Sequence, residues 1–221
     1  MDVKCHHVNG RFDVCLPLPY LAAMTDPAPP PIDPKEAAIL RAAFDCFARY
    51  GLRRTSMADI AAGAGMSRPA LYLHYAGKED IFNALVRAHF ETSEKAVERV
   101  LARPGPAEEV LLSTFQAIDG AAVEAMLTSP HADEILSANG SFSQTAVVEA
   151  HARITRHIAA WVARGVAEGR YSLEGLHCSA DDFAATLMAA KFGIKSFAKD
   201  FADYRAAQGR VAAIFGKALT R

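Results

Sequence analysis

The chain has 221 residues, of which 51% are hydrophobic, and its formal net charge is −1. This length and apolar content provide a buried core for one large domain or two small ones. No apolar run approaches the roughly 18–20 residues needed to span a bilayer, so a membrane-spanning protein is not expected.

Residues 1–32 differ in composition from the rest of the chain. The segment D-P-A-P-P-P-I-D-P contains prolines that cannot propagate a helix and that favour extended backbone. We therefore expect residues 1–32 to form a disordered or loosely docked leader. Met24 lies just before this segment, so a translation start at Met24 instead of Met1 remains an open alternative.

The first predicted helix covers about 34–50. Apolar residues recur there at spacings of three and four, as Ile39, Ala43 and Phe47 illustrate, which is typical of an amphipathic helix. Gly51 follows at the position where helices commonly end.

Two much shorter helices are predicted next. Ser56 starts the first, with Asp59 three residues later as in a capping box, and the G-A-G run at 63–65 ends it. Ser67 starts the second, with Pro69 in the first turn, where a missing N–H does no harm.

A braced pair of short helices joined by a glycine-containing turn is typical of a helix-turn-helix. Neither short helix is stable alone, so both depend on apolar contacts with the helix at 34–50. We expect a small core made of Phe44, Ile60, Ala64, Met66 and Leu71. The second short helix would then present its first turn to base edges in a major groove.

The remainder reads as longer helices separated by breaks, beginning with a helix from about Glu79 to Ala102. Breaks are expected at 103–106, 129–130, 139–140, 168–171 and 199–203, which leaves helices near 106–127, 130–138, 143–168, 179–199 and 203–219. Abundant alanine and few β-branched runs also favour helices over a sheet. We expect an all-α fold with a three-helix DNA-binding domain at 33–78 and a body of about six helices at 79–221.

Charge is unevenly distributed between these two parts. Residues 33–78 hold seven basic and four acidic residues, a net charge of +3, so the remainder carries −4. A basic end on an acidic body indicates a polyanionic partner for that end.

The run T-S-M-A-D-I-A-A-G-A-G-M-S-R-P-A-L-Y-L-H-Y-A-G-K-E-D-I-F resembles the DNA-binding domain of the TetR family of transcriptional regulators. The similarity is close over about 34–82, and the length of the helical body agrees with the family. Signature positions fall on Gly65, Leu71, Tyr72, His74, Tyr75 and Lys78. The resemblance implies that Tyr72, His74 and Lys78 contact phosphates, that Arg68 and Ala70 face bases, and that Tyr75 is structural.

The residue types of this segment suit the same roles. Arginine can donate two hydrogen bonds to guanine, which favours base recognition by Arg68. Hydroxyl, imidazole and ammonium donors suit phosphates, which position a protein without specifying sequence. The candidate DNA-binding residues are Arg54, Thr55, Ser56, Ser67, Arg68, Pro69, Ala70, Tyr72, His74 and Lys78. For Arg54 a plain solvated charge is an equal alternative.

The TetR resemblance also implies a homodimer formed by the last two long helices. Both helices have apolar faces, and small residues on the first permit close approach. The alternative is that these faces complete the core of the monomer. The predicted interface residues are Phe183, Leu187, Ala190, Ile194, Phe197, Val211, Ile214 and Phe215.

By the same resemblance, the middle helices at about 79–168 enclose an effector pocket. Its predicted lining residues are Phe90, Phe115, Ile118, Met126, Phe142 and Trp161. Gln116, His151 and His157 are possible polar anchors. For each of these pocket candidates, lining residues and anchors alike, an ordinary core position is the favoured alternative. His151 and His157, six residues apart, belong on different faces of a helix and make no metal site.

We therefore expect a cytoplasmic, ligand-responsive repressor that binds a palindromic DNA operator as a homodimer. No metal or other cofactor is expected, because the four cysteines form neither a CxxC pair nor a ligand spacing. One alternative is a helical enzyme, but no Ser/His/Asp set, carboxylate pair or phosphate loop supports it. A DNA-binding adaptor controlled by a protein partner is the other, and the absence of a cavity would favour it.

Overall fold

The computed structural model describes residues 33–142 and 144–220, and the predictions for residues 1–32 lie outside them. Within these residues the chain is all-helical, as predicted. Its helices are α2 (Pro34–Tyr50), α3 (Met57–Gly63), α4 (Arg68–Tyr72), α5 (Lys78–Leu101), α6 (Ala107–Leu127), α7 (Ala132–Phe142), α8 (Gln144–Ala167), α9 (Ala180–Phe197) and α10 (Phe201–Leu219).

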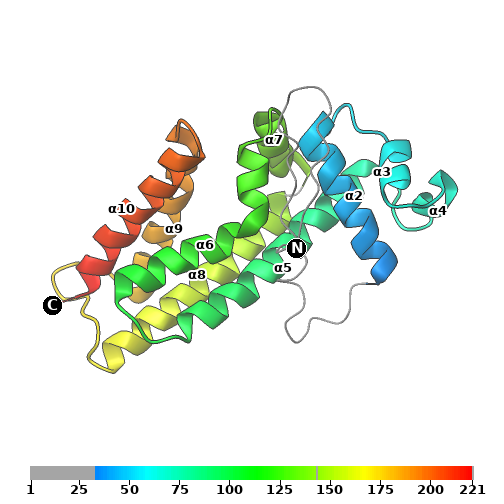
Figure 1. The fold of residues 1–221 in the computed structure, drawn as a ribbon. Helices are drawn as coiled ribbons and strands as arrows, with labels where there is room; N and C mark the ends of the chain where they lie inside the picture. The colour runs from blue at the N-terminus through cyan, green and yellow to red at the C-terminus, as the bar shows by residue number, and fades with distance from the viewer. Residues whose placement is uncertain (1–32, 143, 221) are drawn as a thin grey trace, which may run out of the picture.

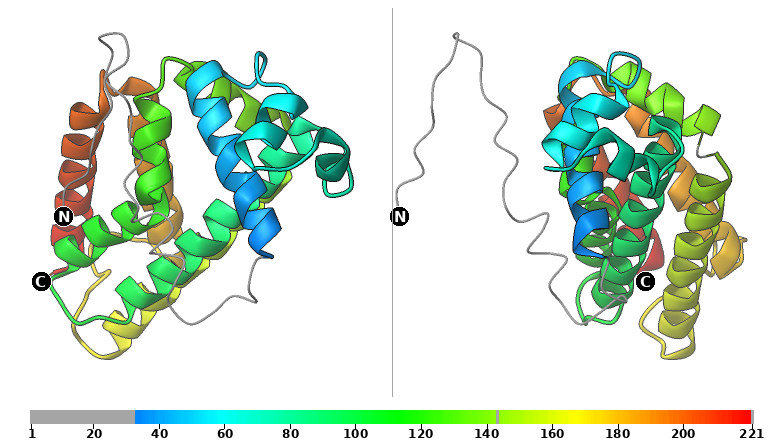
Figure 2. Two further views of the ribbon diagram at one scale, coloured as in Figure 1. Left: turned by 45° about the vertical axis from the view of Figure 1, so that its right-hand side comes forward. Right: turned by 90° about the vertical axis from the view of Figure 1, so that its right-hand side faces the viewer.

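The helices form a head and a body, which α5 connects (Figure 1). Helices α3 and α4 project at one end of the molecule, while α9 and α10 lie at the opposite end. Between them, α5, α6 and α8 run along the length of the body, and α6 packs on both α5 and α10. The left view of Figure 2 shows α3 and α4 at the edge of the molecule, beyond α2, and in the right view these two helices face the viewer.

Two apolar cores hold these parts together. The head core contains Ile39 and Phe47 of α2, together with Ile60 of α3 and Leu71 of α4. The body core joins α5, α6, α8, α9 and α10. Helix α5 contributes to both, because its first turns enter the head core and its last turns the body core.

The head core also extends beyond the predicted limit at residue 78. Ile81 and Phe82 of α5 belong to it, and so do Ile135 and Ala138 of α7. Contacts that cross from head to body can therefore transmit a change in one part to the other.

Most helix ends lie within two residues of their predicted positions, but the predicted break at 139–140 is wrong. Helix α7 continues through Asn139 and Gly140 to Phe142. A glycine inside a helix costs only about 1 kcal/mol. Burial of Ile135 and Ala138 in the head core outweighs that cost.

Helix α6 is bent at Gly120 (Figure 2). The backbone there has φ 57° and ψ −172°, a conformation that is essentially restricted to glycine. By length and composition α6 also meets the criteria for a membrane span, contrary to the expectation from uninterrupted apolar runs. In this fold it is a core helix, because Leu111 and Phe115 are fully buried against the neighbouring body helices.

Candidate DNA-binding surface and the cavity beside it

The turn between α3 and α4 holds the two short helices in a fixed relation. The capping box at Ser56 starts α3, with the Asp59 N–H donating to Ser56 Oγ at 3.2 Å and the Ser56 N–H to Asp59 Oδ2 at 2.9 Å. Gly65 adopts the left-handed conformation, with φ +67°, that reverses the chain. Ser67 then caps α4 through the Ala70 N–H, at 3.3 Å. These contacts confirm the predicted helix starts.

Helix α4 is anchored on one side and free on the other. Leu71 is fully buried in the head core, whereas Arg68, Pro69 and Tyr72 are exposed. The Arg68 guanidinium lies 5.6 Å from the centroid of the Tyr72 ring, and its Nη2 lies 3.4 Å from the Tyr72 hydroxyl. The two side chains thus form one exposed donor group on the outer face of α4.

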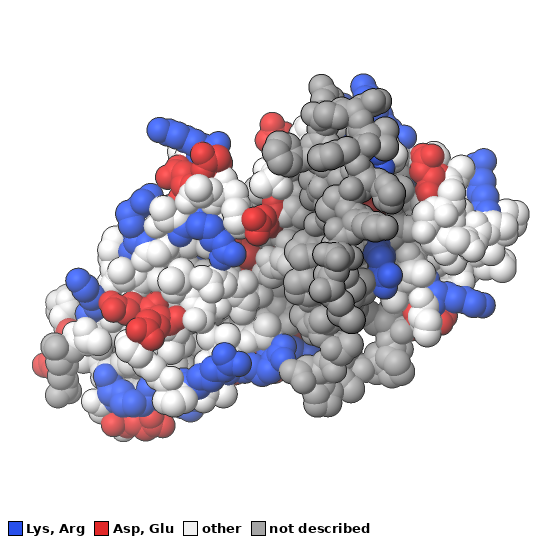
Figure 3. Space-filling view, in the orientation of Figure 1, with Lys and Arg blue, Asp and Glu red and all other residues white. Residues whose placement is uncertain are grey.

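Other predicted contact residues surround this face. Arg54, Ser56, Ser67 and His74 are exposed, and Ala70 is half-buried. Figure 3 shows separate Lys and Arg side chains at this end, set among uncharged residues and a few acids. Such a surface can follow a phosphate backbone without presenting a single dense positive patch.

Thr55 does not belong to this surface, so the prediction for its side chain is wrong. Thr55 is 1% exposed, and its hydroxyl lies 2.7 Å from the Gly51 carbonyl oxygen and 3.2 Å from that of Cys46. The hydroxyl therefore satisfies carbonyl groups at the end of α2 and cannot reach DNA.

Lys78 has a structural role in addition to any contact with DNA. Its ammonium donates to the carbonyl oxygens of Arg53 and Thr55, each at 3.0 Å. These bonds fix the loop between α2 and α3 to the start of α5. Tyr75 is structural as predicted, since its hydroxyl donates to Glu36 Oε1 at 2.9 Å.

Hydrogen bonds also connect the head to the body at the C-terminal end of α2. The Ser129 hydroxyl, between α6 and α7, donates to the Ala48 carbonyl oxygen at 2.7 Å. The Arg53 N–H donates to the Glu134 carboxylate of α7. A movement of α7 and of the connection before it would therefore act on α2 and on the loop that follows α2.

A cavity of about 250 Å³ lies where the head meets the body. Phe44, Phe47 and Ala48 of α2 line it from the head, and side chains of α5, α6, α7, α8 and α9 complete it. An apolar cavity of about 150 Å³ is enough to bind benzene, so this one can hold a larger molecule.

The predicted pocket residues are only partly correct. Phe90, Ile118 and Met126 line the cavity, and so does the predicted polar anchor His151. The predictions for Phe115 and Trp161 are wrong, because both side chains are buried in the body core away from the cavity. Phe142 ends α7, and its side chain lies outside the described part of the structure.

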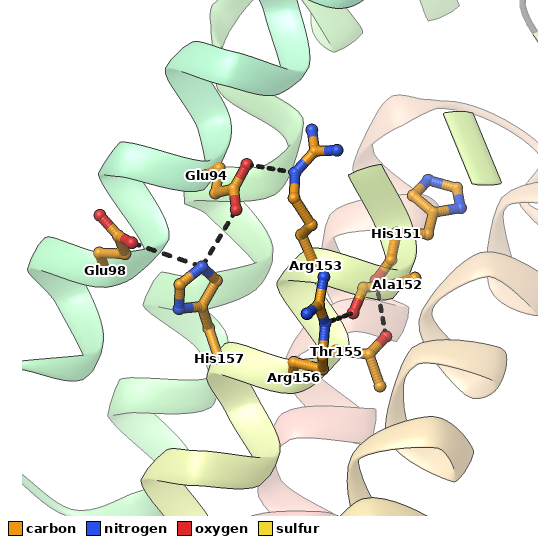
Figure 4. Close-up of polar contacts among 8 residues, drawn as sticks. All are labelled: Glu94, Glu98, His151, Ala152, Arg153, Thr155, Arg156 and His157. Atoms are coloured by element: carbon orange, nitrogen blue, oxygen red, sulfur yellow. Dashed lines mark hydrogen bonds and ion pairs between the residues drawn. The ribbon is translucent and has the colours of Figure 1, made fainter. Parts of the chain in front are cut away.

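His151 and His157 point to different sides of α8, as predicted (Figure 4). His157 Nε2 lies 3.1 Å from Glu94 Oε1, and Arg153 donates to the other oxygen of Glu94 at 2.8 Å. His151 instead stacks on Phe192, with 3.9 Å between ring centroids. Of the two histidines, therefore, only His151 faces the cavity. Gln116 is exposed and lies outside it.

One wall of the cavity is polar, and its two lysines were not among the predicted pocket residues. Asp119 accepts hydrogen bonds from Lys191 Nζ at 2.6 Å, from the Tyr204 hydroxyl at 3.0 Å and from Gln208 Nε2 at 2.5 Å. Lys195, one turn beyond Lys191 on α9, also lines the cavity. Spacing alone could have indicated both lysines, because they continue the buried i, i+4 series of Phe183 and Leu187.

Electrostatics at this wall are set mainly by burial. Burial lowers the pKa of His89 and of His151 to about 4, so both imidazoles are neutral at pH 7. Burial and the neighbouring Lys191 ammonium lower the pKa of Lys195 to about 8. Across the described residues, no group of three or more His, Cys, Asp or Glu is arranged to hold a metal ion.

The residues predicted for a dimer interface divide into two groups. Phe183 and Leu187 lie in the body core, at 4% and 0% exposure, so their prediction as interface residues is wrong for this packing. Phe197 and Ile214 are 86% and 65% exposed. Ala190, Ile194, Val211 and Phe215 are intermediate, and Phe215 packs edge-on against Phe183.

Comparisons with known proteins agree with this arrangement. A family profile described as "Bacterial regulatory proteins, tetR family" matches residues 39–85. The probable HTH-type transcriptional regulator ArpR of Pseudomonas putida is 30% identical over 153 residues, which cover 62% of this chain and 70% of that protein. The uncharacterized HTH-type regulator YezE of Bacillus subtilis is 34% identical over 80 residues, which cover 36% of this chain and only 41% of that protein.

A solved structure extends the agreement to the body. SmeT, the repressor of the Stenotrophomonas maltophilia multidrug efflux pump SmeDEF, superposes with a TM-score of 0.62 and 18% identity. The superposition covers 84% of this chain and 90% of SmeT, and at that identity it speaks for the fold alone. Together with the matched head and the relative ArpR, this places the chain in the TetR family of bacterial transcriptional regulators, which bind DNA and are not enzymes.

Proposed function

We propose that the protein is a cytoplasmic, homodimeric repressor that binds a palindromic operator and leaves it when a small molecule fills the cavity. The observation that carries this proposal is the position of the cavity, because α2 forms part of its wall and also braces α3 and α4. A ligand there contacts the helix on which the DNA-binding surface depends.

The proposed mechanism is a population shift between two arrangements of head and body. A ligand favours the arrangement to which it binds more tightly, and only that difference in affinity can release DNA. Packing of α5 in both cores provides the mechanical connection, together with the bonds from Ser129 to α2 and from the loop after α2 to Glu134 of α7.

Dimerisation would supply the second DNA-binding surface. Phe197 is the last residue of α9, Ile214 lies on α10, and both are exposed. They support an interface at the end of the body away from α4. Two heads would then occupy successive major-groove faces of an operator with two-fold symmetry, about one helical turn apart.

Control by a small ligand is favoured over control by a protein partner, because the cavity offers room for a ligand. SmeT, which shares the fold, is itself described as a repressor. A transcriptional activator would bind DNA through the same protein surface, so a transcription assay decides between repression and activation.

The proposal is tested by selecting bound fragments from the genome of the source organism and transcribing them in vitro. We expect a fragment with an inverted repeat, and we expect lower transcription when the purified protein is added. Recovery of no fragment above background would contradict the proposal. Increased transcription would contradict the repressor assignment alone.

A further inference from the structure

Lys195 places one positive charge in the cavity, and no described residue forms an ion pair with it. The Asp119 carboxylate accepts hydrogen bonds from Lys191, Tyr204 and Gln208. Its negative charge therefore balances the charge of Lys191, and its oxygens already bond the two α10 side chains. Across residues 33–142 and 144–220, no ion pair involves Lys195. A partly buried ammonium without a partner is costly unless an anion joins it.

No other described group on this wall supplies that anion. The groups that face Lys195 are Lys191 on its own helix, Asp119 on α6, His89 on α5 and His151 on α8. Neutral imidazoles leave the wall with a net charge of about +1 at pH 7. The rest of the lining is apolar and includes five phenylalanines, among them Phe44 and Phe90.

We propose that the effector is an apolar small molecule with a single carboxylate, which pairs with Lys195 while its apolar body lies against α2. This inference rests on the proposed function, because it names the ligand class of the same cavity. A dianionic phosphate fits less well, since its second charge would lie in an apolar cavity without a partner.

Three probes with one shape and different head groups test this proposal: 4-phenylbutyrate, 4-phenylbutan-1-ol and 4-phenylbutylamine. Binding of each to the full chain is measured by titration calorimetry at pH 7. We expect the carboxylate to bind at least about tenfold more tightly than the alcohol, and the amine to bind most weakly. Equal or tighter binding of the alcohol or amine, or no binding of any probe, would overturn the proposal.

Variants identify the residue responsible. Lys195→Met and Lys195→Gln should remove the preference for the carboxylate and leave binding of the alcohol unchanged. Lys95→Met, at an exposed position of α5 outside the cavity, is the matched control and should retain the preference. A preference that survives in both Lys195 variants would show that another group binds the head group.

The dependence on pH provides an independent readout. Since the pKa of Lys195 is about 8, affinity for the carboxylate should decline as pH rises above 8, by up to tenfold per pH unit. The alcohol should show no such decline, and neither should the carboxylate bound to Lys195→Met. A carboxylate affinity that is constant between pH 7 and 10 in the wild type would contradict the role of Lys195.

DNA binding is measured separately, so that the two proposals can fail independently. If the protein prefers the carboxylate but selects no DNA, the proposed function fails and the inferred ligand class stands. If the protein selects an operator but shows no preference for the carboxylate, the inference about the ligand fails alone.

Discussion

The guanidinium of Arg68 and the hydroxyl of Tyr72 lie together on the free side of a five-residue helix. That position follows from the burial of Leu71, which fixes the opposite side of α4 in the head core. A side chain held in this way needs little ordering when it meets a base edge, which favours specific recognition.

Arg68→Ala should weaken binding to the selected operator about 5- to 150-fold, corresponding to about 1–3 kcal/mol for one bidentate base contact. Binding to random DNA should weaken much less. Fluorescence anisotropy with both DNAs at one salt concentration measures the difference. Arg164→Ala, at an exposed position of α8, serves as the control. Equal losses on operator and random DNA would mean that Arg68 contacts only phosphate.

The role of Thr55 could not be predicted from its residue type and its position in the sequence. A hydroxyl near a helix start suits a phosphate contact, but burial decides its actual partners, and a single sequence does not reveal burial. Thr55→Val should lower the free energy of unfolding by about 1–3 kcal/mol, because carbonyl groups at the end of α2 lose a donor. Urea unfolding at fixed protein concentration measures this. An unchanged stability would refute the role assigned to the hydroxyl.

Among the elements, α6 differs most from its sequence pattern. An apolar helical pattern continues through Gly120, so the sequence predicts an uninterrupted helix, and the structure instead bends there. The bend lies directly after Asp119, whose carboxylate connects α6 to α9 and α10. Capping residues and prolines marked most helix ends correctly, because those signals act locally. A bend that depends on packing of distant helices leaves no such signal.

Gly120→Ala distinguishes the bend from a straight helix by the sign of its effect. In a straight helix alanine would stabilise the protein by about 1 kcal/mol. In the observed conformation alanine is strained, and we expect a loss of about 1–3 kcal/mol in the free energy of unfolding. Chemical denaturation of both proteins measures the sign, and a gain in stability would argue against the bend.

On the scale of the whole molecule, the head and the opposite end of the body present different surfaces. The head, with α3 and α4, carries the candidate DNA-binding surface, and the opposite end, with α9 and α10, carries exposed apolar side chains. The sequence predicted this division of the chain. It did not distinguish interface from core on α9, because Phe183 and Phe197 share one apolar pattern and only the packing of α10 and α6 separates them.

Ile214→Glu should convert the proposed dimer into monomers, because a charge replaces an exposed apolar side chain at the proposed interface. Sedimentation velocity measures the oligomeric state, and the affinity for the operator should fall with it. Val148→Glu, which changes an exposed valine of α8 in the same way, should remain dimeric. A dimeric Ile214→Glu would place the interface elsewhere.

Methylation interference on the selected operator tests most directly whether α4 enters the major groove. We predict that methylation of guanine N7, which lies in the major groove, blocks binding at two positions about 10–10.5 base pairs apart. Interference only from methyl groups in the minor groove, or from none at all, would contradict the account.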